Sequence, residues 1–506
     1  MRIPLILVGL ALGGCAATHH QYDPPAQPVP TAWKNAHPAD SLGRIQPEVA
    51  VAAPNAVPQL GQLPAVAPWW AVFNDTTLTR LENQANVLNF TTRAAVTRVE
   101  QARAQLRIAD AQRSPIVAAA PSVYHSVLSA NRPVQSSIIQ PVSVPQTQFY
   151  VPLNVSYEVD LWGRLRRGAQ AATANLLANE ADEQAVRLTV AADAANSYYS
   201  LRGLDAELLV LDSARQARRY NVQLTNARFK AGVDNEIGFR RAETELANVE
   251  ASAVELRRQR AGLVASLSTL TGRPASSFTV PSVLPDSVSA SSALPDQRVP
   301  SASAAPLLPT PPRIPATLPA QLLTRRPDLR RAERLTAAAD LRADAARLAR
   351  LPTIQLNGFV GPQSARIGDL PNVTSSYTYY VGGGLNIPIF DGGRLRGNQQ
   401  LAEAQTREVS ATYQGLTLTA YEEVETALAD VAFSQAQLVA QQRALRAARL
   451  AGRLTLERYR RGLIDYFAVV DADRQTLDAA RLVVQTQTTQ LRAAVQLVRT
   501  LGGGWQ

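Results

Sequence analysis

The chain contains little of what enzymes and disulfide-linked domains are built from. It has one cysteine and four histidines among 506 residues, which excludes intramolecular disulfides and cysteine-based zinc sites. A histidine-based metal site or catalytic triad has little to draw on, so we expect no metal, no cofactor and no enzyme. Aromatic residues make up 6% of the chain and hydrophobic residues 46%, so Ala, Leu and Val supply much of the apolar content. This balance is typical of long helices.

Lysine is also scarce, since only Lys34 and Lys230 accompany the arginines that give a formal net charge of +10. A positive charge of this size points first to nucleic acid or an anionic surface. The arginines, however, are scattered among Glu, Asp and Gln, with no basic run and no interleaved aromatic residues. We therefore expect a solvated surface and no nucleic-acid partner.

The N-terminus has the layout of a secretory signal, with an apolar run over residues 3–12 that is too short for a stable membrane anchor. Cys15 follows two glycines directly and resembles the lipobox cysteine of bacterial lipoproteins, which carries several acyl chains. We predict a signal peptide at 1–14 and lipidation of Cys15. Because Ala16 rather than Asp follows, the expected address is the outer membrane. An incidental cysteine in an ordinary signal peptide is the alternative.

Two halves of the sequence repeat each other. Residues 228–232 (Arg-Phe-Lys-Ala-Gly) line up with residues 458–462 (Arg-Tyr-Arg-Arg-Gly), 230 positions later. At the same offset, Gly-Arg-Leu-Arg occurs at 163–166 and again at 393–396. Each half therefore reads as a helix, two strands, a long helix, a glycine turn and a second long helix.

The repeat divides the chain into predicted segments. The first structural repeat covers 69–272 and the second covers 321–502. A connector rich in Pro and Ser joins them at 273–320, and its composition predicts an extended chain. Residues 15–68 have a similar composition and form the predicted lipidated N-terminal tail.

The long helices carry an apolar residue at every seventh position. In the last helix this stripe is Val470, Leu477, Val484, Leu491 and Val498. Such a narrow stripe marks coiled-coil packing and leaves the remaining helix surface to water. The predicted helices are 163–230, 235–271, 393–460 and 466–501, of which the longer two would each extend about 100 Å. A long coiled-coil wall needs such helices; a rod-like scaffold is the alternative.

Stretches of alternating apolar and polar residues lie in both halves. The predicted strands are near 116–128 and 148–160 in the first repeat and near 353–361 and 376–389 in the second. Segments of about ten residues with one apolar and one polar face suit a lipid-facing, water-lined β-barrel. A soluble sheet packed on one core gives the same pattern.

Four strands per chain cannot close a barrel, because the smallest outer-membrane barrels need about eight. An open strand edge in lipid leaves backbone groups unpaired, so the chain must assemble with copies of itself. Two copies supply the minimum number of strands, and three supply enough for a water-filled lumen. The sequence pattern demands an oligomer without choosing between them.

Six motifs together resemble the TolC-like outer membrane factor family, in its lipoprotein branch. They are Cys15; Pro68-Trp69-Trp70 with Phe73 and Asp75; Asp160-Leu161-Trp162-Gly163-Arg164; Arg325-Arg326-Pro327-Asp328; Phe390-Asp391-Gly392-Gly393-Arg394; and Arg458-Tyr459-Arg460-Arg461-Gly462. The resemblance implies a mostly α fold with transmembrane β, in which a long α-helical coiled-coil barrel continues an outer-membrane β-barrel. It implies four strands per protomer and 12 in a homotrimer.

The resemblance also implies a function and partners. Such proteins are passive exit ducts of tripartite efflux pumps for drugs or other small toxic compounds, opened by a periplasmic adaptor protein and an inner-membrane pump. The chain would be anchored in outer-membrane lipid and extend into the periplasm, with the connector at 273–320 in an equatorial belt. Two alternatives stay open: a duct for type I protein secretion, and a lipid-anchored periplasmic coiled-coil scaffold without a pore.

In such ducts the periplasmic end narrows where the helical hairpins turn, which the resemblance places at Gly232 and Gly462. After the second turn, Phe467, Asp471 and Arg474 share one helix face, at i, i+4 and i+7. The resemblance implies that they are the pore-ring hydrophobe, the acidic ring and its basic neighbour. Three Asp471 carboxylates around the axis would attract cations.

Two further gate residues precede the second turn. By the same resemblance, Tyr459 and Arg460 are expected to bond to a neighbouring helical hairpin and to hold the closed state. Some relatives carry a second acidic residue where this chain has Ala468, so we expect a single acidic ring and weaker cation selectivity. For each of these gate positions, an ordinary helix-surface residue is the alternative.

Overall fold

The computed structural model describes residues 25, 29–35, 68–129, 144–281, 308–314 and 319–503. The predicted lipidation site, Cys15, and the predicted signal peptide lie outside the described residues, as do most of the N-terminal tail and much of the connector. The chain divides into two compact units. The strand unit comprises residues 1–26, 98–179 and 331–414, and the helical unit comprises 27–97, 180–330 and 415–506.

Helices account for most of the described chain, as the fold class predicted. They are α1 (Thr76–Leu88), α2 (Phe90–Ala111), α3 (Arg164–Lys230), α4 (Glu236–Leu270), α5 (Pro319–Arg325), α6 (Pro327–Leu348), α7 (Val373–Ser376), α8 (Arg394–Arg460) and α9 (Tyr466–Thr500). Short 3-10 turns lie at Trp69–Phe73, Ala275–Ser277 and Ile367–Asp369. None of the described helices is both long and apolar enough to cross a membrane.

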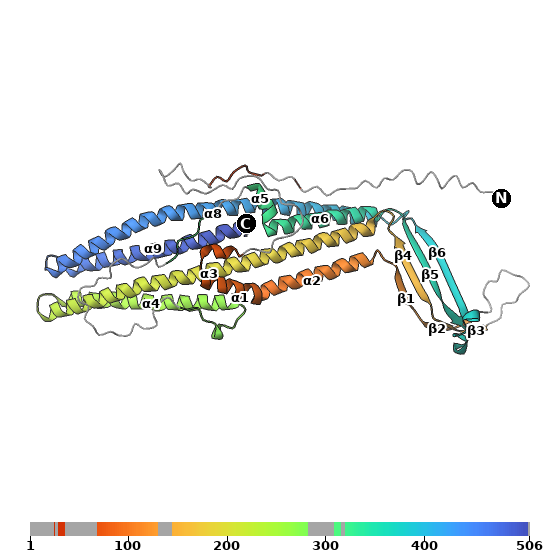
Figure 1. Ribbon diagram of the computed structural model, residues 1–506, viewed down its shortest axis with the longest axis horizontal. Helices are drawn as coiled ribbons and strands as arrows, with labels where there is room; N and C mark the ends of the chain where they lie inside the picture. The colour runs from red at the N-terminus through yellow and green to blue at the C-terminus, as the bar shows by residue number, and fades with distance from the viewer. Residues whose placement is uncertain are drawn as a thin grey trace, which may run out of the picture. The chain divides into compact units, whose positions relative to one another are not determined.

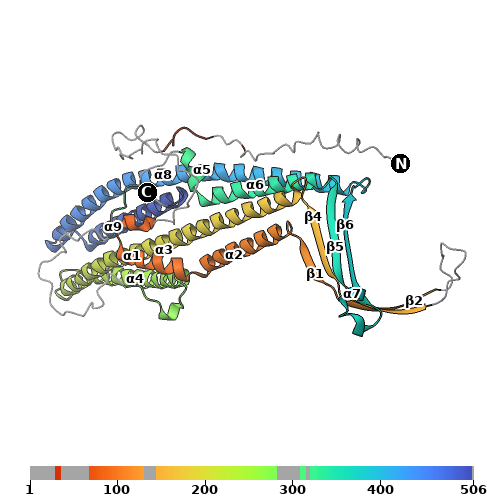
Figure 2. The same cartoon turned by 45° about the vertical axis from the view of Figure 1, so that its right-hand side comes forward.

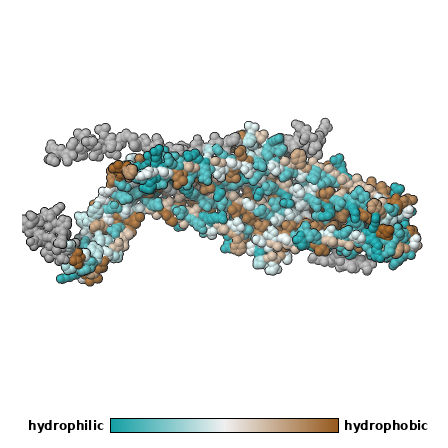
Figure 3. Space-filling model, turned by 180° about the vertical axis from the view of Figure 1, so that it is seen from behind, coloured by the Kyte–Doolittle hydropathy of each residue, from teal (hydrophilic) through white to brown (hydrophobic). Residues whose placement is uncertain are grey.

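The long helices form two hairpins of matching size, α3 with α4 and α8 with α9 (Figure 1). α3 and α8 each have 67 residues, and α4 and α9 each have 35. Equivalent residues of the two hairpins therefore lie 230 positions apart along their whole length, which is the offset of the sequence repeat. Apolar and hydrophilic side chains are mixed over the face seen in Figure 3, as expected of helices that bury only a narrow stripe.

The strand unit contains one antiparallel sheet (Figures 1 and 2). Its strands are β1 (Ile116–Ala119), β2 (Ser122–Leu128), β3 (Val144–Tyr150), β4 (Leu153–Val159), β5 (Thr353–Ser364) and β6 (Tyr377–Asn386). β5 is the longest strand, and it pairs with β4 and β6 over most of its length and with β3 at its end. The four predicted strand regions thus appear as six segments, because the first two are each interrupted once.

Proline and glycine cause these interruptions. Pro121 and Pro152 lack the N–H group that a strand ladder needs, and the strand breaks at each of them. Opposite on β5, a Cβ added to Gly361 would lie 2.2 Å from the carbonyl oxygen of Val151, so only glycine fits there. The breaks lie at one level of the sheet, and Figure 2 shows β2 leaving the direction of β1.

The sheet leaves apolar side chains exposed. Examples are Val123 (64% exposed), Leu356 (46%) and Val381 (85%). Within the described part of the chain, the edge strands β1 and β6 each pair on one side only. These features differ from those of a soluble sheet packed on one core, and they call for lipid or further chains to cover the sheet.

Two carboxylates start the helices that follow the strands. Asp160 accepts hydrogen bonds from two backbone N–H groups in the first turn of α3, at 3.0 and 2.8 Å. Asp391 does the same at the start of α8, at 3.0 and 2.8 Å. The first N–H groups of a helix have no partner inside it, so these aspartates supply one. This explains why an Asp precedes the Gly-Arg motif in both repeats.

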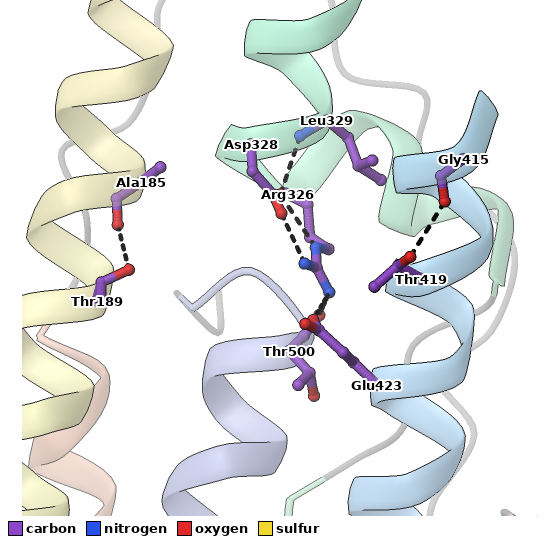
Figure 4. Close-up of polar contacts among 9 residues, drawn as sticks. All are labelled: Ala185, Thr189, Arg326, Asp328, Leu329, Gly415, Thr419, Glu423 and Thr500. Atoms are coloured by element: carbon purple, nitrogen blue, oxygen red, sulfur yellow. Dashed lines mark hydrogen bonds and ion pairs between the residues drawn. The ribbon is translucent and has the colours of Figure 1, made fainter. Parts of the chain in front are cut away.

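A buried arginine joins three elements of the helical unit (Figure 4). Arg326, between α5 and α6, donates to Asp328 at 3.0 and 2.6 Å and to Glu423 of α8 at 2.7 Å. It also donates to the carbonyl oxygen of Thr500, at the end of α9, at 3.3 Å. The Arg-Pro-Asp motif therefore fixes the start of α6 against the second hairpin.

The largest core cluster of the helical unit surrounds Trp69. Trp69 contacts the ring of Phe73, and Phe73 contacts that of Tyr199 on α3. Asp75 begins α1 by accepting two backbone N–H groups, and it also accepts the hydroxyl of Tyr198 at 2.7 Å. The aromatic residues and this aspartate hold α1 against α3.

Glu82 on α1 is fully buried, and within the described residues neither carboxylate oxygen has a hydrogen-bond partner. Burial raises the pKa of Glu82 well above its ordinary value of 4.5. The folded chain therefore retains a proton that the unfolded chain releases as the pH rises above 4.5. The stabilising effect of this retained proton is complete below pH 4.5 and decreases as the pH rises above that value.

We predict that Glu82→Leu raises the free energy of unfolding at neutral pH by about 1–3 kcal/mol, because it removes a buried group without a partner. Between acid and neutral pH, the stability of the variant should also fall less than that of the wild type. Thermal unfolding of the detergent-solubilised protein at several pH values measures both effects. Glu82→Gln is the matched control, since it removes the titration but keeps a buried polar group. Identical pH slopes in the wild type and Glu82→Leu would contradict the prediction.

Candidate functional site

The two hairpins end in equivalent glycine turns. Gly232 and Gly462 have φ angles of 69° and 73°, in the left-handed region that glycine adopts without strain. The second helix of each hairpin then starts at a polar cap. Asn235 accepts a backbone N–H in α4 at 3.2 Å, and Asp465 accepts one in α9 at 3.3 Å. Both predicted turn glycines therefore lie where the chain reverses.

Tyr459 links the second hairpin to the turn of the first. Its side chain is 1% exposed, and its hydroxyl donates to the Asp234 carboxylate at 2.8 Å. Arg228 completes the group, with its guanidinium 4.8 Å from the centre of the Tyr459 ring and its Nε 3.5 Å from Asp234. Burial and the neighbouring Asp234 raise the pKa of Tyr459, so the hydroxyl keeps its proton and remains a donor.

Arg460 makes a second link between the hairpins. It donates to the hydroxyl of Tyr220 on α3 at 2.8 Å, and its guanidinium lies 5.3 Å from the centre of that ring. Tyr459 and Arg460 thus each bond to a residue of the first hairpin. Their role in holding a closed state stays a prediction.

The three predicted residues of the α9 face have different surroundings. Phe467 is 59% exposed and contacts the guanidinium of Arg241 from α4. Asp471 is exposed and accepts a hydrogen bond from Gln475, one turn along the same helix, at 2.9 Å. Arg474 turns to the first hairpin and forms an ion pair there. The three residues lie on one stretch of α9, but each of them contacts a different partner.

Glu245 of α4 is the partner of Arg474, and the sequence reasoning missed it. Its side chain is buried and accepts from Arg474 Nε at 3.1 Å. Its other carboxylate oxygen lies 3.2 Å from the buried guanidinium of Arg218 on α3. One carboxylate therefore connects α3, α4 and α9. Glu245 lies four residues before Val249, the first residue of the apolar stripe of α4, and therefore on the same helix face. A charged residue on that apolar face was the sequence signal that could have identified it.

Asp473 is a second charged residue that was missed. It is partly buried and accepts a hydrogen bond from Asn221 of α3 at 2.9 Å. Burial raises the pKa of Asp473 to about 6, against the smaller opposing effects of Arg218 and Asn221. The interface between the hairpins therefore contains a carboxyl group whose pKa is well above that of an exposed aspartate.

The described residues contain no group of three or more His, Cys, Asp or Glu side chains placed to hold a metal ion. The polar groups described above bond to each other across the two hairpins. These bonds form only when the two turns are aligned. They can therefore hold the hairpins together, and their loss can release the hairpins from each other.

Comparison with known proteins places this architecture among outer-membrane proteins. The family model described as "Outer membrane efflux protein" matches residues 81–273 and 318–503. The solvent efflux pump outer membrane protein SrpC of Pseudomonas putida is 30% identical over 499 residues, covering 98% of this chain and 97% of the relative. The cation efflux system protein CusC of Escherichia coli O6:H1 is 26% identical, covering 99% and 98%.

A solved structure has the same fold. The outer membrane protein VceC of Vibrio cholerae superimposes with a TM-score of 0.76 at 26% sequence identity. The match covers 88% of this chain and all of that chain. The likeness therefore includes most of both repeats.

We predict that Glu245→Gln destabilises the protein by about 3–5 kcal/mol, because the variant removes the carboxylate that forms an ion pair with the buried Arg218 guanidinium. Glu250→Gln is the matched control on the same helix. Glu250 is exposed and pairs with Arg219 at 3.1 Å, so its loss should cost at most about 1 kcal/mol. Thermal unfolding of both variants in detergent makes the comparison. Equal losses would show that the Glu245 bridge contributes no more than a surface ion pair.

Proposed function

Because the chain belongs to the outer membrane efflux protein family, we propose that it is the outer-membrane exit duct of a tripartite efflux pump. In this role it passively conducts small molecules from the periplasmic side across the outer membrane. The family consists of outer-membrane channels, and we assign the chain no catalytic step. The observation that carries the proposal is that both repeats match the family, including the hairpins and the sheet.

The strand unit supports assembly as a homotrimer. Its exposed apolar side chains and its edges, which are free in the described chain, call for further chains and lipid. Three protomers would supply 12 strand regions, enough to enclose a water-filled lumen. Cys15, as the proposed lipidation site, would add an anchor in the same membrane.

The helical unit supports a periplasmic gate at the hairpin turns. Tyr459 and Arg460 bond the second hairpin to the first, and both bonds lie beside the turns. Opening requires the second hairpin to move relative to the first, which breaks these bonds. A periplasmic adaptor protein, acting with an inner-membrane pump, would supply the contacts that favour the open arrangement.

The cargo class follows from relatives in name only. SrpC is named for solvent efflux and CusC for cation efflux. We therefore propose small toxic compounds as cargo, and a deletion strain tests this against protein export. Greater susceptibility to such compounds, with an unchanged set of secreted proteins, is the expected result. Loss of a secreted protein without any change in susceptibility would instead favour a type I secretion duct.

The gate itself is tested by removing one hydroxyl group. We predict that Tyr459→Phe increases the open probability of the purified protein in a planar bilayer, because Asp234 loses the bond that ties the hairpins together. A several-fold increase corresponds to the loss of about 1 kcal/mol. Single-channel recording measures it.

Tyr421→Phe is the matched control for this variant. Tyr421 is also a buried tyrosine of α8, but within the described chain its hydroxyl has no hydrogen-bond partner. Its removal should leave the conductance as in the wild type. Equal behaviour of the two variants would mean that the Tyr459 hydroxyl does not restrain the gate.

A further inference from the structure

A cation from the first hairpin lies against the predicted pore-ring residue of the second. The guanidinium of Arg241, on α4, is 5.0 Å from the centre of the Phe467 ring. This distance is typical of a cation–π contact, which holds a guanidinium against an aromatic face. Both side chains are exposed, so the pair faces solvent rather than the core.

The repeat makes Arg241 the counterpart of Asp471. Each is the sixth residue of its helix, α4 or α9, and the two are 230 positions apart. Ile237 and Phe467 are counterparts in the same way, and they are 63% and 59% exposed. Each hairpin therefore carries an exposed apolar residue and, one turn later, an exposed charge. The charges have opposite signs.

Several exposed charges near the turns form no ion pair among the described residues; Arg241 and Asp471 belong to this group, as do Lys230, Arg461 and Asp465. In the first two turns of α4, Arg240 pairs with both Glu236 and Glu243. Arg241 and Asp471 have no ion-pair partner among the described residues, and their described contacts are with Phe467 and Gln475. The Asp471 carboxylate also interacts electrostatically with Arg474, three residues along α9. Further along α9, Arg474 is compensated by Glu245.

We propose that Arg241 is a second charge-selecting residue of the constriction, so that each protomer presents one guanidinium and one carboxylate to the permeating solute. This inference rests on the proposed function of the chain as a duct. A ring of Asp471 alone concentrates cations and excludes anions. Arg241 adds a positive charge that opposes this field, so the duct admits anionic and zwitterionic solutes as well as cations.

The ratio of K⁺ to Cl⁻ permeability tests this directly. It is obtained from the reversal potential of the purified, full-length protein in a planar bilayer under a KCl gradient. The wild type should show a weak preference, and Arg241→Gln should raise the ratio by about threefold or more, because one positive charge that opposes Asp471 is then removed. Asp471→Asn should shift the ratio in the opposite direction. Arg241→Lys, which keeps the charge, should retain the wild-type ratio.

Arg240→Gln is the matched control. It removes the same charge from the neighbouring residue, whose guanidinium is neutralised by two glutamates on its own helix. Its permeability ratio should equal that of the wild type. Variants that open rarely are recorded in the Tyr459→Phe background.

The outcomes separate the inference from its premise. If Asp471→Asn changes the ratio and Arg241→Gln behaves like Arg240→Gln, the duct stands and the role of Arg241 is overturned. If Arg241→Gln and Arg241→Lys shift the ratio equally, the effect comes from the shape of the side chain and the charge-selecting role is again overturned. If no protein conducts, even with Tyr459→Phe, both the duct and the inference fail.

Discussion

Equal helix lengths in the two hairpins are the constraint on which the contacts at their turns depend. α3 and α8 have the same number of residues, so Gly232 and Gly462 come at equivalent positions of the two repeats. One residue more in either helix would advance its end by about 1.5 Å and rotate it by about 100°. Tyr459 would then point away from Asp234, and Arg474 away from Glu245. The repeat thus preserves a register as well as a fold.

Buried charged groups depend on this register, because burying a charge without a partner is energetically costly. Glu245 and Arg218 are both buried, and their ion pair forms only while α3 and α4 keep their alignment. Arg326 plays the same part where α5, α6, the middle of α8 and the end of α9 meet. Such pairs add little to stability compared with apolar packing, but they penalise a slipped arrangement strongly. In long helices with a narrow apolar stripe, that penalty selects one alignment among several.

The sequence pattern predicted the helices closely and the sheet less well. Glycine turns and the repeat bound the helices, so the bounds of the long helices differ from the predicted ones by one residue at most. Pro121 separates β1 from β2, and Pro152 separates β3 from β4. From the alternation alone, each of these pairs was predicted as one continuous strand. The contacts of Glu245, Asp473 and Arg241 were missed because they depend on which faces of two distant helices meet. Heptad spacing identifies a buried stripe, but it does not identify the residues opposite it. Tyr459 and Arg460 were found through the family resemblance, which carries information on that pairing.

The separation of the paired residues along the chain also determines the order in which the protein can fold. Asp234 and Tyr459 are 225 residues apart, and Asn221 and Asp473 are 252 apart. During synthesis and secretion the first repeat emerges without these partners, whereas the Arg218–Glu245 pair is complete within it. Long-range contacts of this kind form late and slowly. Until the second repeat follows, the polar face of the first hairpin therefore stays unpaired. A chain that stalls after its first half exposes that face to proteases and to other unfinished chains.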